Sequence, residues 1–189
     1  MSKLYKFGWL PDGKTDEPYE YPGIWAKEKA TGPDRLVIAP RTHQANLLHI
    51  IAECMQEPFL LLYVLAIPRG GGKAGRYQSS HSFTFAQLKK FLESYADFFQ
   101  QDGRHNLWIR SSDEQTLVYD RHNVIYAYGA QAQLIPILET SGIIESHQVR
   151  FPVPHSHHYH AEFVSEETRL LNGQEWIISS LRPGDENPD

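Results

Sequence analysis

The residues most capable of chemistry lie near the C-terminal end of the chain, in the run His155-Ser-His-His-Tyr-His160-Ala-Glu162. In an extended segment successive side chains point to opposite faces, so His158, His160 and Glu162 share one face and His155 and His157 share the other. Two imidazoles and a carboxylate on one face are a suitable ligand set for Zn²⁺ or non-haem Fe²⁺. One hypothesis is therefore a metal site built on the first three residues, with the other two beside them.

The competing interpretation is that this histidine cluster is structural. A metal site needs at least three donors that converge on one point, and a more distant residue such as His147 or His105 would have to complete the set. The sequence contains no HExxH motif, which would place two ligands on a helix. We therefore expect the rings to point apart, with no metal and no other cofactor bound.

A second candidate is the glycine-rich, basic run Arg69-Gly-Gly-Gly-Lys73-Ala-Gly-Arg76. Glycines that follow a strand let backbone N–H groups approach an anion, and three cations would strengthen the attraction. The register fits neither a P-loop nor a dinucleotide-binding fingerprint. Arg69, Lys73 and Arg76 thus predict a loop that binds an anion or a partner, whereas the alternative is a mobile hairpin tip.

Other reactive residue types give weaker signals. There is no GxSxG elbow for a serine nucleophile. The single cysteine, Cys54, excludes an internal disulfide and a cysteine-rich zinc site, and its place beside an apolar helical stripe predicts a buried, inert thiol. His122 falls in a predicted turn, where we expect it to be solvated.

Composition restricts the class of partner. The net charge of −5 argues against general binding to nucleic acid, which requires a basic surface. No apolar run approaches the roughly 18 residues of a membrane span, and the N-terminal residues lack the apolar core of a signal peptide. These features predict a cytoplasmic protein that does not interact with membranes.

The positioning elements are organised around the uncharged run from Phe59 to Ile67, which lies between two prolines and predicts a strand covered on both faces. Helical periodicity over 42–56, over 84–101 and up to Ser141 predicts three main helices, the second with a Thr84/Gln87 capping box. A β-meander is expected over 107–128, a short helix over 161–171 and a last strand over 175–181.

Together these elements predict a single α+β domain over residues 1–182, with a largely antiparallel mixed sheet and the three helices packed on it. Residues 1–35 are expected to be an irregular, aromatic-rich segment, and 183–189 a disordered acidic tail. The core should contain the following residues: Leu61, Leu62, Val64, Leu65, Leu88, Phe91, Leu92, Tyr95, Ile109 and Ile125.

Two functions agree with this pattern. The first is a non-enzymatic protein that binds another protein, with a general profile similar to that of bacterial toxin-neutralising immunity proteins, although no motif carries the likeness. The alternative is a small metal-dependent enzyme, a hydrolase or a non-haem oxygenase, that uses the His155–Glu162 cluster. The sequence leaves the oligomeric state open.

Overall fold

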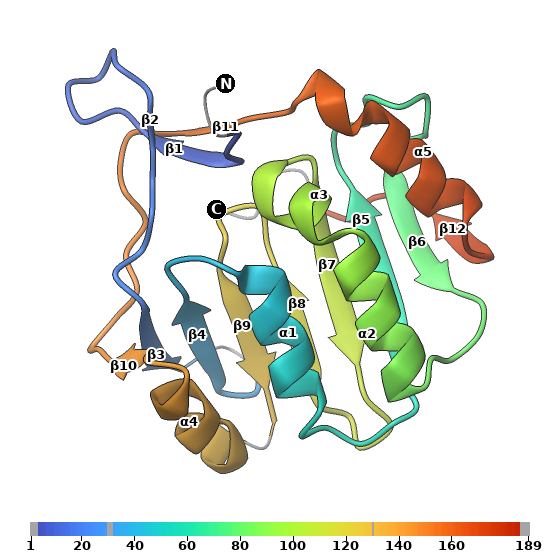
Figure 1. The fold of residues 1–189 in the computed structure, drawn as a ribbon, viewed down its shortest axis with the longest axis horizontal. Coiled ribbons are helices and arrows are strands. Elements are labelled where there is room, and N and C mark those ends of the chain that lie inside the picture. Colours follow the sequence, from blue (N-terminus) through green and yellow to red (C-terminus); the bar gives the residue numbers. More distant parts are fainter. Residues whose placement is uncertain (1–3, 30–31, 130, 186–189) are drawn as a thin grey trace.

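A nine-stranded sheet with helices packed on it forms the body of the α+β structure, a computed structural model that describes residues 4–29, 32–129 and 131–185 (Figure 1). Neighbouring strands within this sheet are antiparallel, except that β10 pairs with β3 in parallel. The strand order is β10 (Ile144–Glu145), β3 (Ile24–Glu28), β4 (Arg35–Ala39), β9 (Ile125–Tyr128), β8 (Thr116–Tyr119), β7 (His105–Arg110), β5 (Leu60–Leu65), β6 (Gly75–Ser79) and β12 (Trp176–Ser179).

The uncharged run around which the chain is organised becomes β5, which pairs with β6 on one side and β7 on the other. Its odd-numbered side chains are buried under the helices, whereas Leu60 is 41% exposed and Leu62 is half-buried on the opposite face. The expectation that both faces are fully covered was therefore wrong. After the glycine-rich run the chain returns as β6, which is antiparallel to β5.

Three helices lie over one face of the sheet in Figure 1: α1 (Gln44–Ala52), α2 (Phe85–Ser94) and α3 (Ala96–Gln101). The predicted capping box at the start of α2 is present, since Thr84 accepts from the Gln87 backbone and donates its own backbone N–H to the Gln87 side chain. The single helix predicted over 84–101 is divided at Tyr95, whose φ of −121° leaves the helical region.

The described chain also contains α4 (Gln131–Thr140), where the third main helix was predicted, and α5 (Val164–Asn172), where a short helix was expected. The three main helices thus become four, because the one predicted over 84–101 is divided. α4 continues through Pro136. Each helix in the described ranges is too short or too polar to cross a bilayer. The expected core is confirmed for every predicted residue except Leu62.

The N-terminal segment is more regular than expected. A second, three-stranded sheet joins β1 (Phe7–Trp9) to β2 (Glu17–Pro18) on one side and to β11 (His155–His157) on the other. Figure 1 shows this small sheet above the upper end of the main one. Lys6 fastens it there, because its buried Nζ donates to the carbonyl oxygens of Phe99 and Asp120 at 2.9 and 2.8 Å.

The expected disordered tail is described only as far as Asp185, and residues 186–189 lie outside the described ranges. Asp185 accepts a hydrogen bond from Arg76 Nη1 at 2.7 Å and another from the backbone of Arg182 at 2.6 Å. The start of the tail is thus tied to strand β6.

Candidate metal centre

The turn between β8 and β9 presents the first histidine of the site. Asp120 Oδ1 accepts from the backbone N–H groups of His122 and Val124, both at 2.9 Å, which closes an Asx-type turn. Asn123 adopts the left-handed conformation at φ 64°, which asparagine tolerates better than most residues. The turn leaves His122 only 3% exposed, so the expectation of a solvated turn histidine was wrong.

Strand β11 supplies two more histidines. It runs antiparallel to β1, with His157 opposite Phe7 and His155 opposite Trp9. The ring of Phe7 lies against His122, His155 and His157, with centroid separations of 5.4, 5.3 and 5.6 Å. The N-terminal strand therefore forms one wall of the site and holds β11 over the β8–β9 turn.

The three histidines converge. One ring nitrogen from each of His122, His155 and His157 lies within 4.8 Å of the other two, which is the spacing expected around a shared ion. The His122 and His157 ring centroids are 4.8 Å apart. The prediction that the rings diverge was therefore wrong for His155 and His157.

Hydrogen bonds orient two of these rings. His122 Nδ1 lies 2.8 Å from Asp120 Oδ2, and His155 Nδ1 lies 3.1 Å from the carbonyl oxygen of Pro152. In the tautomers that these acceptors favour, each Nδ1 carries the proton and each Nε2 presents a lone pair. A ligating histidine commonly donates its second N–H to a carboxylate or a carbonyl in this way.

Other ring nitrogens in the cluster lack protein partners. Within the described ranges, His122 Nε2 and both nitrogens of His157 are buried and make no hydrogen bond. Leaving a buried polar group unsatisfied costs about 1–3 kcal/mol. His105 likewise has both ring nitrogens buried without a partner in the described chain, but here such nitrogens belong to histidines that converge, and that convergence suits a ligand.

The protonation state of His157 also suits a ligand. Burial first, and then the neighbouring His122 and Arg121, lower its pKa to about 3. The ring is therefore neutral across the physiological range, and only neutral imidazole coordinates a metal.

The structure does not bring the predicted set His158, His160 and Glu162 together as a ligand group. His158 Nε2 lies 2.7 Å from Asp16 Oδ2, and His160 Nε2 lies 2.8 Å from the carbonyl oxygen of Tyr5. Glu162 is exposed at the start of a 3₁₀ turn. Side chains do alternate between two faces along this segment as predicted. The face whose nitrogens converge, however, is that of His155 and His157 and not that of His158 and His160.

The basic loop of residues 69–76 does not form an open anion-binding site either. The backbone N–H groups of Arg69 and Gly70 donate to the carboxylate of Glu167 at 3.0 and 2.7 Å, so a carboxylate of the chain itself takes their hydrogen bonds. A Cβ on Gly70 would lie 2.7 Å from the Val164 carbonyl oxygen, so this glycine allows α5 to approach. Arg76 pairs with Asp185, as described above.

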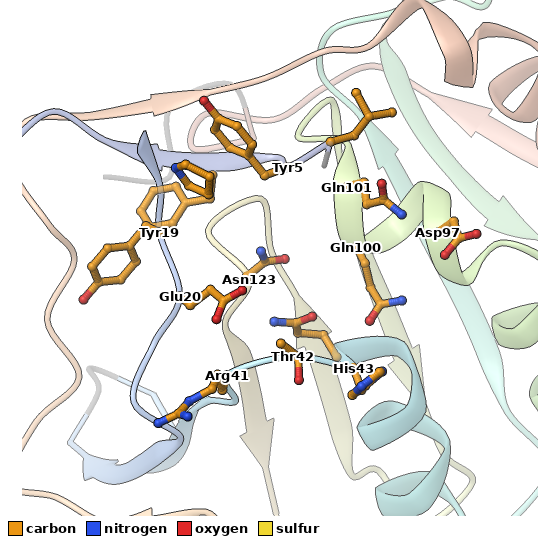
Figure 2. A pocket seen from close by; sticks show the side chains of 14 residues that line it. Tyr5, Tyr19, Glu20, Arg41, Thr42, His43, Asp97, Gln100, Gln101 and Asn123 are labelled. Carbon is orange, nitrogen blue, oxygen red and sulfur yellow. The ribbon is translucent and has the colours of Figure 1, made fainter. Parts of the chain in front are cut away.

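A cavity of about 300 Å³ lies between the N-terminal segment, the start of α1 and α3 (Figure 2). Tyr19, Arg41, His43 and Asn123 surround it, and Phe7 lines it as well. His43 has φ 59° at the start of α1, an uncommon conformation for a residue other than glycine.

Sequence reasoning missed His122 and Asp120. The spacing Asp120-Arg-His122 directly after an alternating strand is a usable signal, because an aspartate that closes a turn can also orient a histidine two positions later. Cys54, which we expected to be buried, is exposed.

Comparisons of the chain with protein-family models, with curated proteins and with solved structures found no match. The functional argument therefore rests on the geometry above.

Proposed function

We propose that the chain is a metal-dependent enzyme of the hydrolase class, with one divalent transition-metal ion held by His122, His155 and His157. The observation that carries the proposal is the convergence of three imidazoles whose buried nitrogens include three without a hydrogen-bond partner in the described chain. Imidazole ligands suit Zn, Cu, Fe and Ni, and a neutral three-histidine set resembles the ligand count of catalytic zinc rather than of structural zinc.

The accessibility of the site supports catalysis over a purely structural ion. Structural zinc sites are closed by four protein ligands, whereas catalytic sites have three and keep one position for water or substrate. His155 and His157 are only half-buried, so the cluster lies near the surface, although His122 Nε2 and both nitrogens of His157 are themselves buried. Zinc bound by three histidines supplies a Lewis acid and an activated water, the chemistry of hydrolysis.

Metal analysis of untagged protein tests the proposal. We expect about one zinc per chain in the wild type, loss of that zinc in His157→Ala, and retention in His158→Ala, which changes a histidine on the opposite face of the same segment. Equal metal content in the two variants would contradict the assignment. Hydrolysis of a nitrophenyl phosphate or nitrophenyl acetate should then rise and fall with zinc occupancy.

The second candidate is the protein-binding role, and the free edge of β12 favours it. This strand ends the nine-stranded sheet, contains no charged residue, and leaves Ile177 and Ile178 58% and 63% exposed. An uncharged, exposed edge can pair with an extended segment of another protein through main-chain hydrogen bonds.

Comparison of wild type with Ile178→Lys tests this role, because a lysine at the edge opposes strand addition. A protein that copurifies with the wild type should be lost from the variant while the zinc content stays the same. Recovery of the same proteins with both forms, or of none with either, would count against the role.

A further inference from the structure

The cavity in Figure 2 is separate from the proposed metal centre. It lies between the N-terminal segment, the start of α1 and α3, and none of the three converging histidines lines it. Its volume of about 300 Å³ is at the small end of the range for ligand sites, which is about 300–1,000 Å³. Several separate parts of the chain supply its polar lining, so it is a second place where a ligand could be held.

Two glutamines present acceptors to this cavity. Gln44 is only 5% exposed, and its Nε2 donates to the carbonyl oxygen of Pro40 at 3.4 Å. Gln100 Nε2 donates to the carbonyl oxygen of Ala96 at 3.1 Å. Each bond engages the amide nitrogen, and neither Oε1 accepts a hydrogen bond in the described chain or is sealed in the core. Both glutamines line the cavity, so their oxygens are available to a ligand there.

Asn123 presents a donor. Its Oδ1 accepts from the Tyr119 hydroxyl at 2.6 Å, which leaves Nδ2 without a partner in the part of the chain that the structure describes. Figure 2 shows Asn123 and Gln100 on facing sides of the cavity, one from the β8–β9 turn and the other from α3. The internal bonds thus decide which atom of each amide remains for a ligand, a donor on one side and an acceptor on the other.

The charges around the cavity are mixed in sign. Arg41 lines it together with the acidic residues Glu20 and Asp97. Such a lining favours neither an anion nor a cation as a class, because each would meet a like charge as well as an opposite one. The amides instead match a neutral ligand that both donates and accepts hydrogen bonds.

The aromatic part of the lining forms a corner. The rings of Phe7 and Tyr19 meet edge to face at 89°, with their centroids 5.7 Å apart. Nucleobases are bound by stacking on the face of an aromatic ring, and two perpendicular rings do not form a slot for a flat base. A corner is better suited to a puckered ring with C–H groups on its faces and hydroxyls around its edge.

We propose that this cavity binds a small neutral polyhydroxylated molecule of the monosaccharide class. Each hydroxyl of such a molecule both donates and accepts, so one molecule can donate to Gln44 and Gln100 and accept from Asn123. Its C–H groups supply apolar surface for the ring of Tyr19. The inference goes beyond the proposed metal-dependent hydrolysis and does not depend on the histidine site.

Two-dimensional NMR of the full ¹⁵N-labelled chain gives a direct test, because the side-chain amides of asparagine and glutamine have their own signals. The protein is titrated with D-glucose, D-galactose and D-mannose and, in separate arms, with adenosine and with inorganic phosphate. We expect at least one sugar to give saturable shifts that include the side-chain signals of Asn123 and Gln100. Adenosine and phosphate should leave these signals unchanged.

Variants locate the sugar. Asn123→Asp keeps an oxygen for the Tyr119 hydroxyl and a residue type that tolerates the left-handed conformation, but it replaces the donor by an acceptor. Gln100→Leu removes the acceptor and preserves helix propensity in α3. Each should weaken sugar binding about tenfold, which corresponds to about 1.4 kcal/mol. Gln148→Leu is the matched control, since Gln148 is exposed and does not line the cavity.

Each outcome decides the proposal. Saturable shifts that weaken in the Asn123 and Gln100 variants and persist in the Gln148 variant support it. If every sugar leaves the spectrum unchanged, or if adenosine or phosphate shifts the lining signals and the sugars do not, the ligand class is wrong. If the sugars bind equally well to wild type and to both cavity variants, the assignment to this cavity is wrong. The zinc content of the chain has no bearing on any of these results.

Discussion

Two buried polar clusters are connected by the same segment of chain, and they differ in how their polar atoms are satisfied. In the first, Arg104 donates to Asp102 at 2.6 and 2.7 Å, to Glu167 at 2.8 Å and to the His160 carbonyl oxygen at 2.8 Å. In the second, the three histidines leave buried nitrogens without a partner in the described chain. The first is complete within the protein, whereas in the second only His122 Nδ1 and His155 Nδ1 have acceptors and three ring nitrogens remain without a partner in the described chain.

The Arg104 cluster holds the fold together, whereas the histidine cluster is suited to binding a ligand. The Arg104 cluster joins β7, the glycine-rich loop and α5, so its hydrogen bonds fix how the C-terminal helix sits on the sheet. The histidine cluster joins β1, β11 and the β8–β9 turn through ring contacts with Phe7 rather than through hydrogen bonds between the rings. A ligand is what would complete it.

Removing a member of the complete cluster should have the largest effect. Glu167→Ala leaves the Arg104 guanidinium and the backbone N–H groups of Arg69 and Gly70 without their acceptor. We expect the free energy of unfolding to fall by about 3–5 kcal/mol, as for other broken buried ion pairs. Urea denaturation measures this.

Glu166→Ala is the control for that experiment, because Glu166 pairs with Arg169 near the surface and its loss should cost no more than about 1 kcal/mol. Similar losses in the two variants would mean that the Arg104 cluster does not stabilise the fold in the way its geometry indicates.

Zinc should stabilise the histidine cluster and leave the Arg104 cluster unaffected, because only the histidines have nitrogens free to bind it. A ligand that binds the folded state alone adds about 2.7 kcal/mol of stability when its concentration is 100 times Kd. We expect zinc to raise the unfolding temperature of the wild type and to leave that of His157→Ala unchanged. Equal stabilisation of both forms would place the zinc elsewhere on the protein.

The sequence was sufficient for the parts of the fold that depend on local pattern. Alternation and turn residues identified the β-meander, and Thr84 with Gln87 identified the start of α2. Alternation also divided the histidines of 155–160 correctly into two faces. What it could not supply was which face meets a third histidine, because that depends on the pairing of β11 with β1, almost 150 residues earlier in the chain.

The same limit applies to the glycine-rich loop. Its composition predicted an approach to an anion, and the structure supplies one in Glu167, a residue 97 positions after Gly70. Local composition can indicate that a backbone will approach a negative charge. Only the tertiary packing of α5 decides that this charge belongs to the chain itself.

A smaller effect, on metal affinity, is expected from changing Asp120, the residue that orients His122. Asp120→Asn keeps an oxygen that can accept from the turn amides but removes the carboxylate charge next to His122 Nδ1. Loss of such a partner typically weakens metal affinity by about 10–100-fold. Competition with a zinc-binding dye measures the change. An unchanged affinity would show that the hydrogen bond positions the turn without tuning the metal.

The smallest effect concerns pH, measured on metal-free protein. The pKa of His157 is lowered in the fold from an ordinary value of 6.5 to about 3, first by burial and then by His122 and Arg121. Below pH 6.5 the unfolded chain therefore takes up a proton on this residue that the folded chain does not. Stability should fall as the pH decreases from about 6.5 towards 3, and this contribution is fully present only above the unfolded value.

His157→Phe removes the titrating group and keeps a ring against Phe7, so its urea midpoint should decline less steeply than that of the wild type over the same pH range. His147→Gln, an exposed histidine, serves as the control and should follow the wild type. If the wild-type and His157→Phe curves run parallel, His157 titrates normally in the fold. Its nitrogens would then be reached by water, and the contrast between a complete and an incomplete buried cluster would disappear.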